Sequence, residues 1–355
     1  MIAHGVTPPR WLSRQPEAPV IIPAEPAFLR ELANLAADWV KKDKRAKQNE
    51  PALPPDWSIK TLLARPSWPF PPLEGVLCAP TLRPDGSLLD TPGYDAETGL
   101  YLEFNGMTYP PLPKRPTLDD ARSAIGTLQQ VFIDFRWRHP AYFSATIAAL
   151  LTIADRYGVP GCTPLFAVRS TTPGSGKGLL IDAISVSATG RCAPRFPQVL
   201  DEDEERKRLF ALALAGDTCG HIDNVTRPLG SPALDMALTS RTYSDRILGK
   251  HETQTAPWNV VLFASGNNMD FHGDAARRVV SIDLDPQMEN PEERTAFAHN
   301  PLLPWVQEEH PKLLAAALTL LQAYFEAGCP AQGLTPVWQL SGMVRPHTFL
   351  SRLGR

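Results

Sequence analysis

The chain has 355 residues, enough for about two domains of ordinary size. Its 35 Lys and Arg residues are balanced by 38 Asp and Glu residues, which gives a formal net charge of −3. This balance excludes a uniformly basic coat of the histone type, so any contact with nucleic acid has to come from a local patch. Hydrophobic residues make up 43% of the chain, which is enough for real cores and argues against wholesale disorder.

The cysteines and the apolar runs narrow the class further. Five cysteines are scattered along the chain without a CxxC pair. This argues against a disulfide framework or a zinc ribbon and predicts a reducing, cytoplasmic location. The first residues lack the apolar core of a signal peptide, and no apolar run reaches 18 residues. We therefore expect no transmembrane helix and no membrane partner.

Prolines set the N-terminal third apart, since about half of the 37 prolines precede residue 120. Within it, apolar residues at helical spacing predict a helix over residues 27–47. The predicted helix ends in a basic run, Lys41, Lys42, Lys44, Arg45 and Lys47. Such a run either complements the negative end of the helix dipole or contacts nucleic-acid phosphate.

A small β-rich unit is predicted around residues 75–104, where Asp85-Gly86 between two strand-like segments indicates a hairpin. A stiff linker follows, formed by Pro110, Pro111, Pro113 and Pro116. We place a domain boundary there, so residues 1–117 are predicted to form a smaller mixed α/β accessory region.

After the linker, strands, turns and helices alternate, which is typical of a parallel α/β sheet flanked by helices. Helices are predicted over residues 118–135, 140–157, 179–189 and 201–215, and buried strands over 165–168, 219–222, 260–264 and 279–284. From residue 291 to 328 the pattern is helical only. We therefore predict a core domain over residues 118–290, and a helical lid with a C-terminal tail over residues 291–355.

The segment TTPGSGK, which ends at Lys177, follows a predicted strand and opens a predicted helix, as a phosphate-binding loop requires. Its glycines let backbone N–H groups approach phosphate oxygens, and Lys177 would reach the β- and γ-phosphates of ATP. An ordinary glycine-rich turn is the alternative interpretation. The residues expected to contact the nucleotide are Thr172, Pro173, Gly174, Ser175, Gly176, Lys177, Gly178 and Leu179.

Two positions depart from the usual phosphate-loop pattern. Thr171 stands in place of the first Gly, and Gly178 stands in place of the Ser or Thr that binds Mg²⁺. Mg²⁺ would then be held otherwise, by water, Asp223 or Thr172, and weak hydrolysis remains open. The run PGSGKG also resembles the loop of adenylate kinases, which keeps a nucleoside monophosphate kinase as a further alternative.

A carboxylate follows the second buried strand, in the run His221-Ile222-Asp223-Asn224. Asp223 at this strand end could hold Mg²⁺ through water. The next position usually holds a Glu that polarises the attacking water, but here it holds Asn224, which cannot accept a proton. The acidic run of residues 201–205 either supplies a substitute or forms a solvated first turn of a helix.

Polar residues also follow or precede the later strands. Asn267 follows the strand at 260–264 and could hydrogen-bond the γ-phosphate or the lytic water. Arg277 and Arg278 precede the last strand and either reach a neighbour's nucleotide as an arginine finger or form a surface ion pair. Residues 243–258 indicate a β-hairpin whose tip, Lys250 and His251, either contacts a DNA backbone or is an exposed turn.

The order of these motifs resembles that of an AAA+ ATPase, and a hairpin before the sensor-1 strand is similar to superfamily 3 and MCM-type replicative helicases. The runs DNVTRPLGSPALDMALTS, DRILG, SGNNM and GDAARRVV more narrowly resemble replication proteins of phages, plasmids and integrative mobile elements. The resemblance covers residues 118–328. It implies an AAA+ fold with a hairpin before sensor 1 and a helical lid. By similarity to mobile-element proteins, residues 1–117 would bind DNA or load the ring.

The resemblance further implies an ATP-dependent DNA helicase or replication initiator, in the cytoplasm of a bacterial host or a phage-infected cell. ATP and Mg²⁺ would be bound between subunits of a ring, such as a hexamer, that moves single-stranded or forked DNA. By motif match, the catalytic positions are Lys177, Asp223 (Mg²⁺), Asn224, Asn267 (sensor 1), Arg277 and Arg278, and the DNA-binding positions are Lys250 and His251. Gly178 and Asn224 favour an alternative, a nucleotide-gated assembly or regulatory module with weak hydrolysis.

Overall fold

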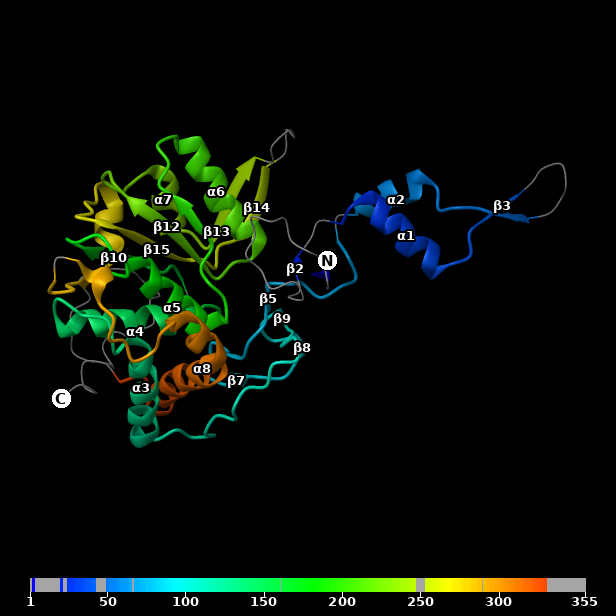
Figure 1. Cartoon of the computed structure of the whole chain (residues 1–355). Coiled ribbons are helices and arrows are strands. Elements are labelled where there is room, and N and C mark those ends of the chain that lie inside the picture. The colour runs from blue at the N-terminus through cyan, green and yellow to red at the C-terminus, as the bar shows by residue number, and fades with distance from the viewer. Residues whose placement is uncertain are drawn as a thin grey trace.

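The structure is a computed structural model that describes residues 2–3, 20–21, 24–42, 49–65, 67–159, 161–246, 253–288 and 290–330. Its body is an α/β unit built on a five-stranded parallel sheet with helices on both faces (Figure 1). In spatial order the strands are β11 (Arg195–Pro197), β12 (Cys219–Val225), β15 (Val261–Asn267), β10 (Leu165–Ser170) and β16 (Val279–Leu284).

Successive side chains of the strands pack alternately into two separate hydrophobic cores, one on each face of the sheet. On β10, Phe166 and Val168 pack into one core, while Leu165 and Ala167 pack into the other, because successive residues of a strand point to opposite faces. The first core lies under α3 (Leu118–Phe132), α4 (Pro140–Ala154), α5 (Lys177–Thr189) and α8 (Leu302–Glu326). The second lies under α6 (Glu202–Ala215), α7 (Pro232–Ala237) and the antiparallel hairpin of β13 (Thr242–Arg246) and β14 (Thr253–Pro257).

The strand order fixes where loops can meet. All four neighbouring pairs of the sheet are parallel, so every strand ends at the same edge. β10 pairs with β15 on one side and β16 on the other, whereas the next strand along the chain, β11, lies at the far edge of the sheet. The loops that follow β10, β15 and β12 therefore gather at one edge, where ligands bind in such sheets.

The predicted core elements are present with small shifts at their ends, and the short 3₁₀ segments η1 (Gly273–Arg278) and η2 (Pro291–Glu293) join them. The helical pattern predicted over residues 291–328 is confirmed for η2 and for α8, but it is wrong for residues 294–301, which form no helix. Within the described part of the chain, no helix combines the length and the apolar character needed to cross a membrane.

The N-terminal elements α1 (Pro26–Ala36), β3 (Val40–Lys42), β4 (Asn49–Pro51) and α2 (Asp56–Leu63) lie apart from the body (Figure 1). The helix predicted over residues 27–47 is wrong for residues 37–42, and residues 43–47 lie outside the described part of the chain. The indole N–H of Trp39 donates to the carbonyl of Ala33 at 2.8 Å, which takes an acceptor that a continuing helix would use.

The interpretation of the basic run as a helix end is wrong for Lys41 and Lys42, which lie in β3 and pair antiparallel with β4. Lys44, Arg45 and Lys47 lie outside the described residues. Nearer the N-terminus, β1 (Ile2–Ala3) pairs antiparallel with β2 (Val20–Ile21).

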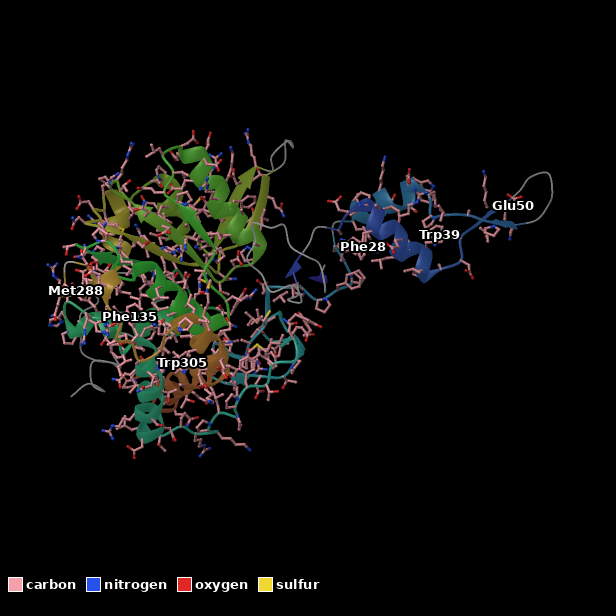
Figure 2. All side chains as sticks on the ribbon, in the orientation of Figure 1. Phe28, Trp39, Glu50, Phe135, Met288 and Trp305 are labelled. Atoms are coloured by element: carbon pink, nitrogen blue, oxygen red, sulfur yellow. The ribbon has the colours of Figure 1, made fainter. Side chains whose placement is uncertain are left out.

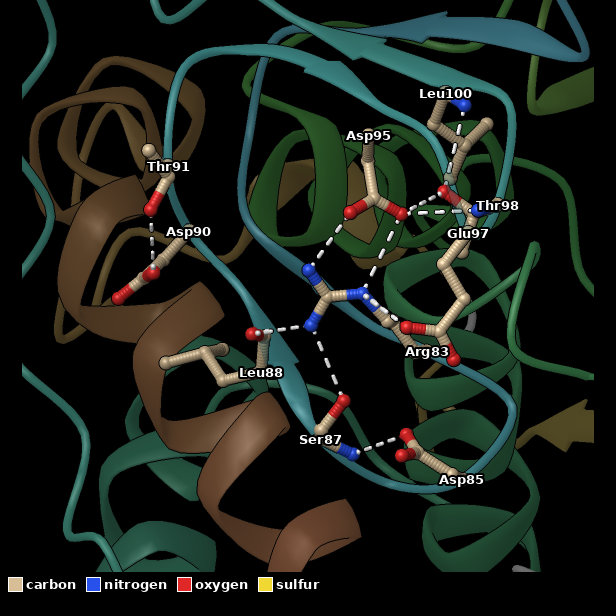
Figure 3. Close-up of polar contacts among 10 residues, drawn as sticks. All are labelled: Arg83, Asp85, Ser87, Leu88, Asp90, Thr91, Asp95, Glu97, Thr98 and Leu100. Carbon is tan, nitrogen blue, oxygen red and sulfur yellow. Dashed lines mark hydrogen bonds and ion pairs between the residues drawn. The ribbon is translucent and has the colours of Figure 1, made fainter.

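A small β unit occupies residues 75–102 and contains β5 (Gly75–Leu77), β9 (Leu100–Leu102) and β8 (Gly93–Asp95) in one sheet. The predicted Asp85-Gly86 hairpin is confirmed, because β6 (Thr81–Leu82) pairs antiparallel with β7 (Leu88–Leu89) and Gly86 has φ 85°. Arg83 ties this hairpin to β8: its guanidinium donates to Asp95 at 2.8 Å and to the Leu88 carbonyl at 3.1 Å (Figure 3). The hydrogen bond from Arg83, together with those from Thr98, lowers the pKa of the Asp95 carboxyl group to about 2.

The small β unit packs against the face of the body that carries α4 and α8. Thr81 and Leu82 donate hydrogen bonds to the carboxyl group of Asp155, at the end of α4. The Tyr109 hydroxyl donates to the Cys78 carbonyl at 3.1 Å, and its oxygen lies 3.4 Å from the ring of His310 on α8. The domain boundary predicted at residue 117 stays a prediction, and the residues before it contact the body through these bonds.

Candidate nucleotide-binding site

The segment 171–176 connects β10 to α5 at the carboxyl edge of the sheet. Gly174 and Gly176 have φ angles of 69° and 80°, in the left-handed region that favours glycine. Gly176 directly precedes the first residue of α5, Lys177. The unpaired N–H groups of the first helical turn therefore face this turn, which gives the loop backbone donors for an anion.

Lys177 points into the space between the phosphate loop and the next strand. Its Nζ donates to Asn267 Oδ1 at 2.8 Å and to Ser175 Oγ at 3.1 Å, with the Thr172 carbonyl 3.4 Å away. Burial lowers the Lys177 pKa, and the nearby Asp223 opposes that shift. The structure therefore brings together the predicted phosphate lysine and the predicted sensor residue, although 90 positions separate them in the sequence.

Asp223 lies at the end of β12, on the far side of Asn267 from the loop. Its Oδ1 accepts a hydrogen bond from Ser265 Oγ at 2.7 Å, and Oδ2 lies 3.4 Å from Arg195 Nη1. Burial raises the Asp223 pKa, but the Ser265 hydrogen bond and the Arg195 charge outweigh that effect and lower the pKa overall. Asp223 is thus held as a carboxylate.

A buried histidine is linked to this carboxylate through the hydroxyl of Ser265. His221 is fully buried on β12, and its Nε2 lies 2.8 Å from Ser265 Oγ. Burial lowers the His221 pKa to about 4, so the ring is neutral at pH 7. The Ser265 hydroxyl hydrogen goes to Asp223, so Nε2 must carry the ring proton and donate it to Ser265. His221, Ser265 and Asp223 therefore form a short chain of hydrogen bonds that orients the carboxylate.

Arg195 is a member of this site that sequence reasoning missed. It begins the edge strand β11, and its Nη2 lies 2.6 Å from Asp182 Oδ2 on α5 while Nη1 lies 3.4 Å from Asp223 Oδ2. The guanidinium also lies beside Gly178: a Cβ at that glycine would stand 3.5 Å from both terminal nitrogens. The one signal in the sequence that could have pointed to Arg195 is its position, as a basic residue at the start of a short strand that ends at the same edge of the sheet as the phosphate loop.

These contacts decide how well the site fits the predicted Mg²⁺ ion. Gly178 offers no hydroxyl ligand, and both oxygens of Asp223 are engaged, one by Ser265 and one by Arg195. Among the described residues no group of three or more His, Cys, Asp or Glu side chains could hold a metal ion. The donor set does not fit a Mg²⁺ ion coordinated directly by the protein, and Asp223 as a Mg²⁺ ligand stays a prediction.

A cavity of about 250 Å³ opens beside the phosphate loop. Phe135 and Met288, which line it, lie on the same side of the body (Figure 2). Its polar end is formed by Arg294, whose guanidinium donates to the Asp134 carboxylate at 2.8 Å. The apolar side chains that line it are Phe135, Leu179, Leu284, Pro286, Met288, Pro291, Phe297 and Leu302.

The predicted arginines do not join this site. Arg277 and Arg278 end η1, at the amino end of β16, which is the opposite edge of the sheet from the phosphate loop. Arg278 is held within its own turn, because Nη1 donates to the Asp274 carbonyl at 3.1 Å. Arg277 is exposed, with no hydrogen bond or ion pair to the described part of the chain. Neither can reach the loop of its own chain.

Other predicted residues are accounted for as follows. Asn224 is exposed beside Asp223 with φ 54°, a left-handed conformation that Asn tolerates. The acidic run belongs to the first turn of α6: Asp201 caps the helix, Glu204 pairs with Arg208 and Glu205 accepts from Ser231. Lys250 and His251 lie outside the described residues, between the two strands of the predicted hairpin.

Comparison with known proteins gives structural likeness only. No protein-family model and no curated protein matches the chain. The A form apo structure of the NrS-1 C-terminal region is 13% identical, with a TM-score of 0.41, over 85% of this chain and 69% of that one. A second A form apo structure of that region, 305–718, is 14% identical with a TM-score of 0.38, over 84% and 69%.

Proposed function

We propose that this chain is an AAA+ type ATPase that binds ATP at the loop before α5 and acts as an ATP-dependent DNA helicase or replication initiator. The observation that carries the proposal is that Lys177, at the start of α5 after β10, lies beside Asn267 and Asp223 of the two neighbouring strands β15 and β12. Lys177 Nζ and Asn267 Oδ1 are 2.8 Å apart. In this arrangement the lysine binds the phosphates, and the asparagine lies between it and the acid.

The strand order supports this assignment of roles. A sensor residue must reach the γ-phosphate or the attacking water from between the phosphate loop and the acid. β15 lies between β10 and β12, so Asn267 occupies that position. The hydrolysis step is attack of water on the γ-phosphorus, which releases ADP and phosphate. Lys177 neutralises phosphate charge in this step, and Asn267 orients the water.

The cavity beside the loop supports a purine nucleotide as ligand. Gly174, Ser175 and Gly176 line one side of it, so a base placed there is continuous with phosphates on the loop. Phe135 and Phe297 offer aromatic faces, and Arg294 and Asp134 offer polar groups at its rim. We propose that the adenine ring of ATP binds in this cavity.

The position of the arginines supports hydrolysis between subunits. β10 has six residues, so Arg277 lies about 20 Å from the loop of its own chain at the usual rise of a strand. An exposed arginine at that edge would serve a nucleotide on a neighbouring copy, as an arginine finger does. A ring such as a hexamer would supply one neighbour to each site.

The DNA part of the proposal rests on the sequence resemblance and on the β13–β14 hairpin. This hairpin precedes the strand that carries Asn267, as the resemblance requires. We propose that Lys250 and His251 at its tip contact DNA phosphates. The double variant Lys250→Ala/His251→Ala should keep basal ATP hydrolysis and lose its stimulation by DNA. Unwinding retained in that variant would refute the hairpin assignment.

A second function is favoured by the surroundings of Asp223. The carboxylate is occupied by Arg195 and Ser265, and Asn224 beside it cannot act as a base. In the acidic run, Asp201 caps α6, and Asp203, Glu204 and Glu205 are paired with Arg206, Arg208 and Ser231. These features favour a nucleotide-gated assembly or regulatory module that binds ATP and hydrolyses it slowly.

Steady-state ATP hydrolysis, with and without single-stranded DNA and over a range of protein concentrations, separates the two. Turnover that rises with DNA and with assembly, and that disappears in Lys177→Ala, supports the helicase or initiator. The matched control is Lys312→Ala, an exposed lysine of α8. ATP binding without turnover favours the assembly module. If ATP does not bind under any condition, both functions are refuted.

A further inference from the structure

An arginine lies between the two residue positions that anchor the metal ion in most phosphate-loop sites. The residue after the loop lysine, Gly178, usually carries a hydroxyl ligand, and the acid at the end of β12 is the second anchor of the metal. Arg195 lies across both places: its terminal nitrogens stand 3.5 Å from where a Cβ of Gly178 would be, and Nη1 is 3.4 Å from Asp223 Oδ2.

The guanidinium is held there by a buried carboxylate. Asp182 follows Gly178 by four residues on α5, so the two positions lie on the same face of the helix. The Asp182 side chain is only 11% exposed, and its Oδ2 lies 2.6 Å from Arg195 Nη2. Arg195 thus bridges a carboxylate of α5 and a carboxylate of β12, and these two contacts hold its guanidinium beside the start of α5.

Arg195 retains the donors that a polyphosphate would need. A guanidinium carries five N–H donors and stays charged at every physiological pH. Two of them contact Asp182 and Asp223, and the others make no hydrogen bond to the described residues. The side chain is 43% exposed, so these donors are accessible to solvent, and the guanidinium lies beside Gly178, the residue that follows the loop lysine. Guanidinium groups bind phosphate oxygens with paired, charge-assisted hydrogen bonds.

We propose that Arg195 replaces Mg²⁺ in this site, so that the chain binds nucleoside triphosphate without a divalent cation. The inference rests on the proposed function, since it names how the same site neutralises its nucleotide. This explains both departures from the usual site together. Arg195 supplies the positive charge that a metal ion would otherwise provide, so a hydroxyl ligand at position 178 is not needed.

The test is calorimetric titration of the full chain with ATPγS, once in excess EDTA and once in excess MgCl₂. We expect wild-type affinities within about threefold of each other. Arg195→Gln should bind at least tenfold more weakly in EDTA, the loss of about 1.4 kcal/mol that one charge-assisted contact supplies. Arg122→Gln, an exposed arginine of α3 at a distance from the loop, is the matched control.

The double variant Gly178→Ser/Arg195→Gln restores a hydroxyl and frees Asp223, and the 3.5 Å approach leaves room for a serine Cβ. It should bind ATPγS only in MgCl₂. A wild type that binds only in MgCl₂ would overturn this inference and leave the proposed function standing. A wild type that binds in neither condition would overturn the proposed function itself. The wild-type comparison decides the question even where a variant fails to fold.

Discussion

Asp155 gives the stability of this protein a specific dependence on pH. It follows the last residue of α4 and is 2% exposed. Its Oδ1 accepts hydrogen bonds from Thr81 Oγ1 at 3.2 Å and from the Leu82 amide at 3.3 Å. Burial raises the Asp155 pKa to about 8, although these hydrogen bonds act in the opposite direction. The carboxyl group is therefore neutral in the folded protein at pH 7.

The sign of the effect follows from the two pKa values. In the unfolded chain the Asp155 pKa is about 3.9, so between about pH 4 and pH 8 the folded state binds one proton more than the unfolded state. The free energy of unfolding then falls as the pH rises, by at most about 1.4 kcal/mol per pH unit. This contribution is fully present below about pH 4 and is lost as the pH rises through 8. Between pH 5 and pH 7 the loss is about 2 to 3 kcal/mol.

The assay is urea unfolding of wild type and Asp155→Asn at pH 5, 6, 7 and 8. An asparagine oxygen can still accept from Thr81 and Leu82 but does not titrate. The wild type should therefore lose about 2 to 3 kcal/mol relative to the variant between pH 5 and pH 7. Asp119→Asn, an exposed carboxylate of α3, is the control and should follow the wild type. Parallel profiles for wild type and Asp155→Asn would refute the reasoning.

Three further predictions concern the site. Lys177→Ala should weaken ATP binding at least tenfold in a calorimetric titration, because one charge-assisted contact of about 1.5 to 3 kcal/mol is lost, while the melting temperature stays close to that of wild type. Arg277→Ala should bind ATP but lose ATP turnover when assembled, whereas Arg278→Ala should lose less turnover because its guanidinium is held by its own turn. Mixing each variant with Lys177→Ala subunits shows whether the arginine acts between chains. A larger loss of turnover in Arg278→Ala would exchange the roles of the two arginines. Ser265→Ala should lower the free energy of unfolding by about 1 to 3 kcal/mol in urea and raise the Asp223 pKa, and an unchanged midpoint would mean that water replaces the hydroxyl.

The sheet and the phosphate loop were predictable because their signals are local. A run of apolar residues such as 165–168 between turns indicates a buried strand, and a glycine-rich turn before an apolar segment indicates the start of a helix. The same signals place Asn267 at the edge of the sheet where the phosphate loop lies, but the structure was needed to show that β15 lies beside β10. The sequence could support this part of the site without any knowledge of side-chain contacts.

The end of α1 was not predictable in the same way. Apolar spacing continued past Ala36, and only a side-chain contact, from the indole of Trp39 to the carbonyl of Ala33, marks the end of the helix. Lys41 and Lys42 then pair with a strand that follows a further six residues along. A periodic pattern reports which residues are apolar, but it does not report which carbonyl a distant side chain takes.

Arg195 shows the same limit at the site itself, and its consequence is chemical. The sequence showed a missing hydroxyl at Gly178 and a missing base at Asn224, and these two departures kept weak hydrolysis open as an alternative. The compensating charge comes from the start of an edge strand, and its partner Asp182 is 13 residues away on a helix. Lys177 and Arg195 carry two positive charges against the two carboxylates of Asp182 and Asp223. The N–H groups of Arg195 that contact neither carboxylate are the donors that a triphosphate would use, and the contacts with Asp182 and Asp223 would hold the guanidinium in place while it binds.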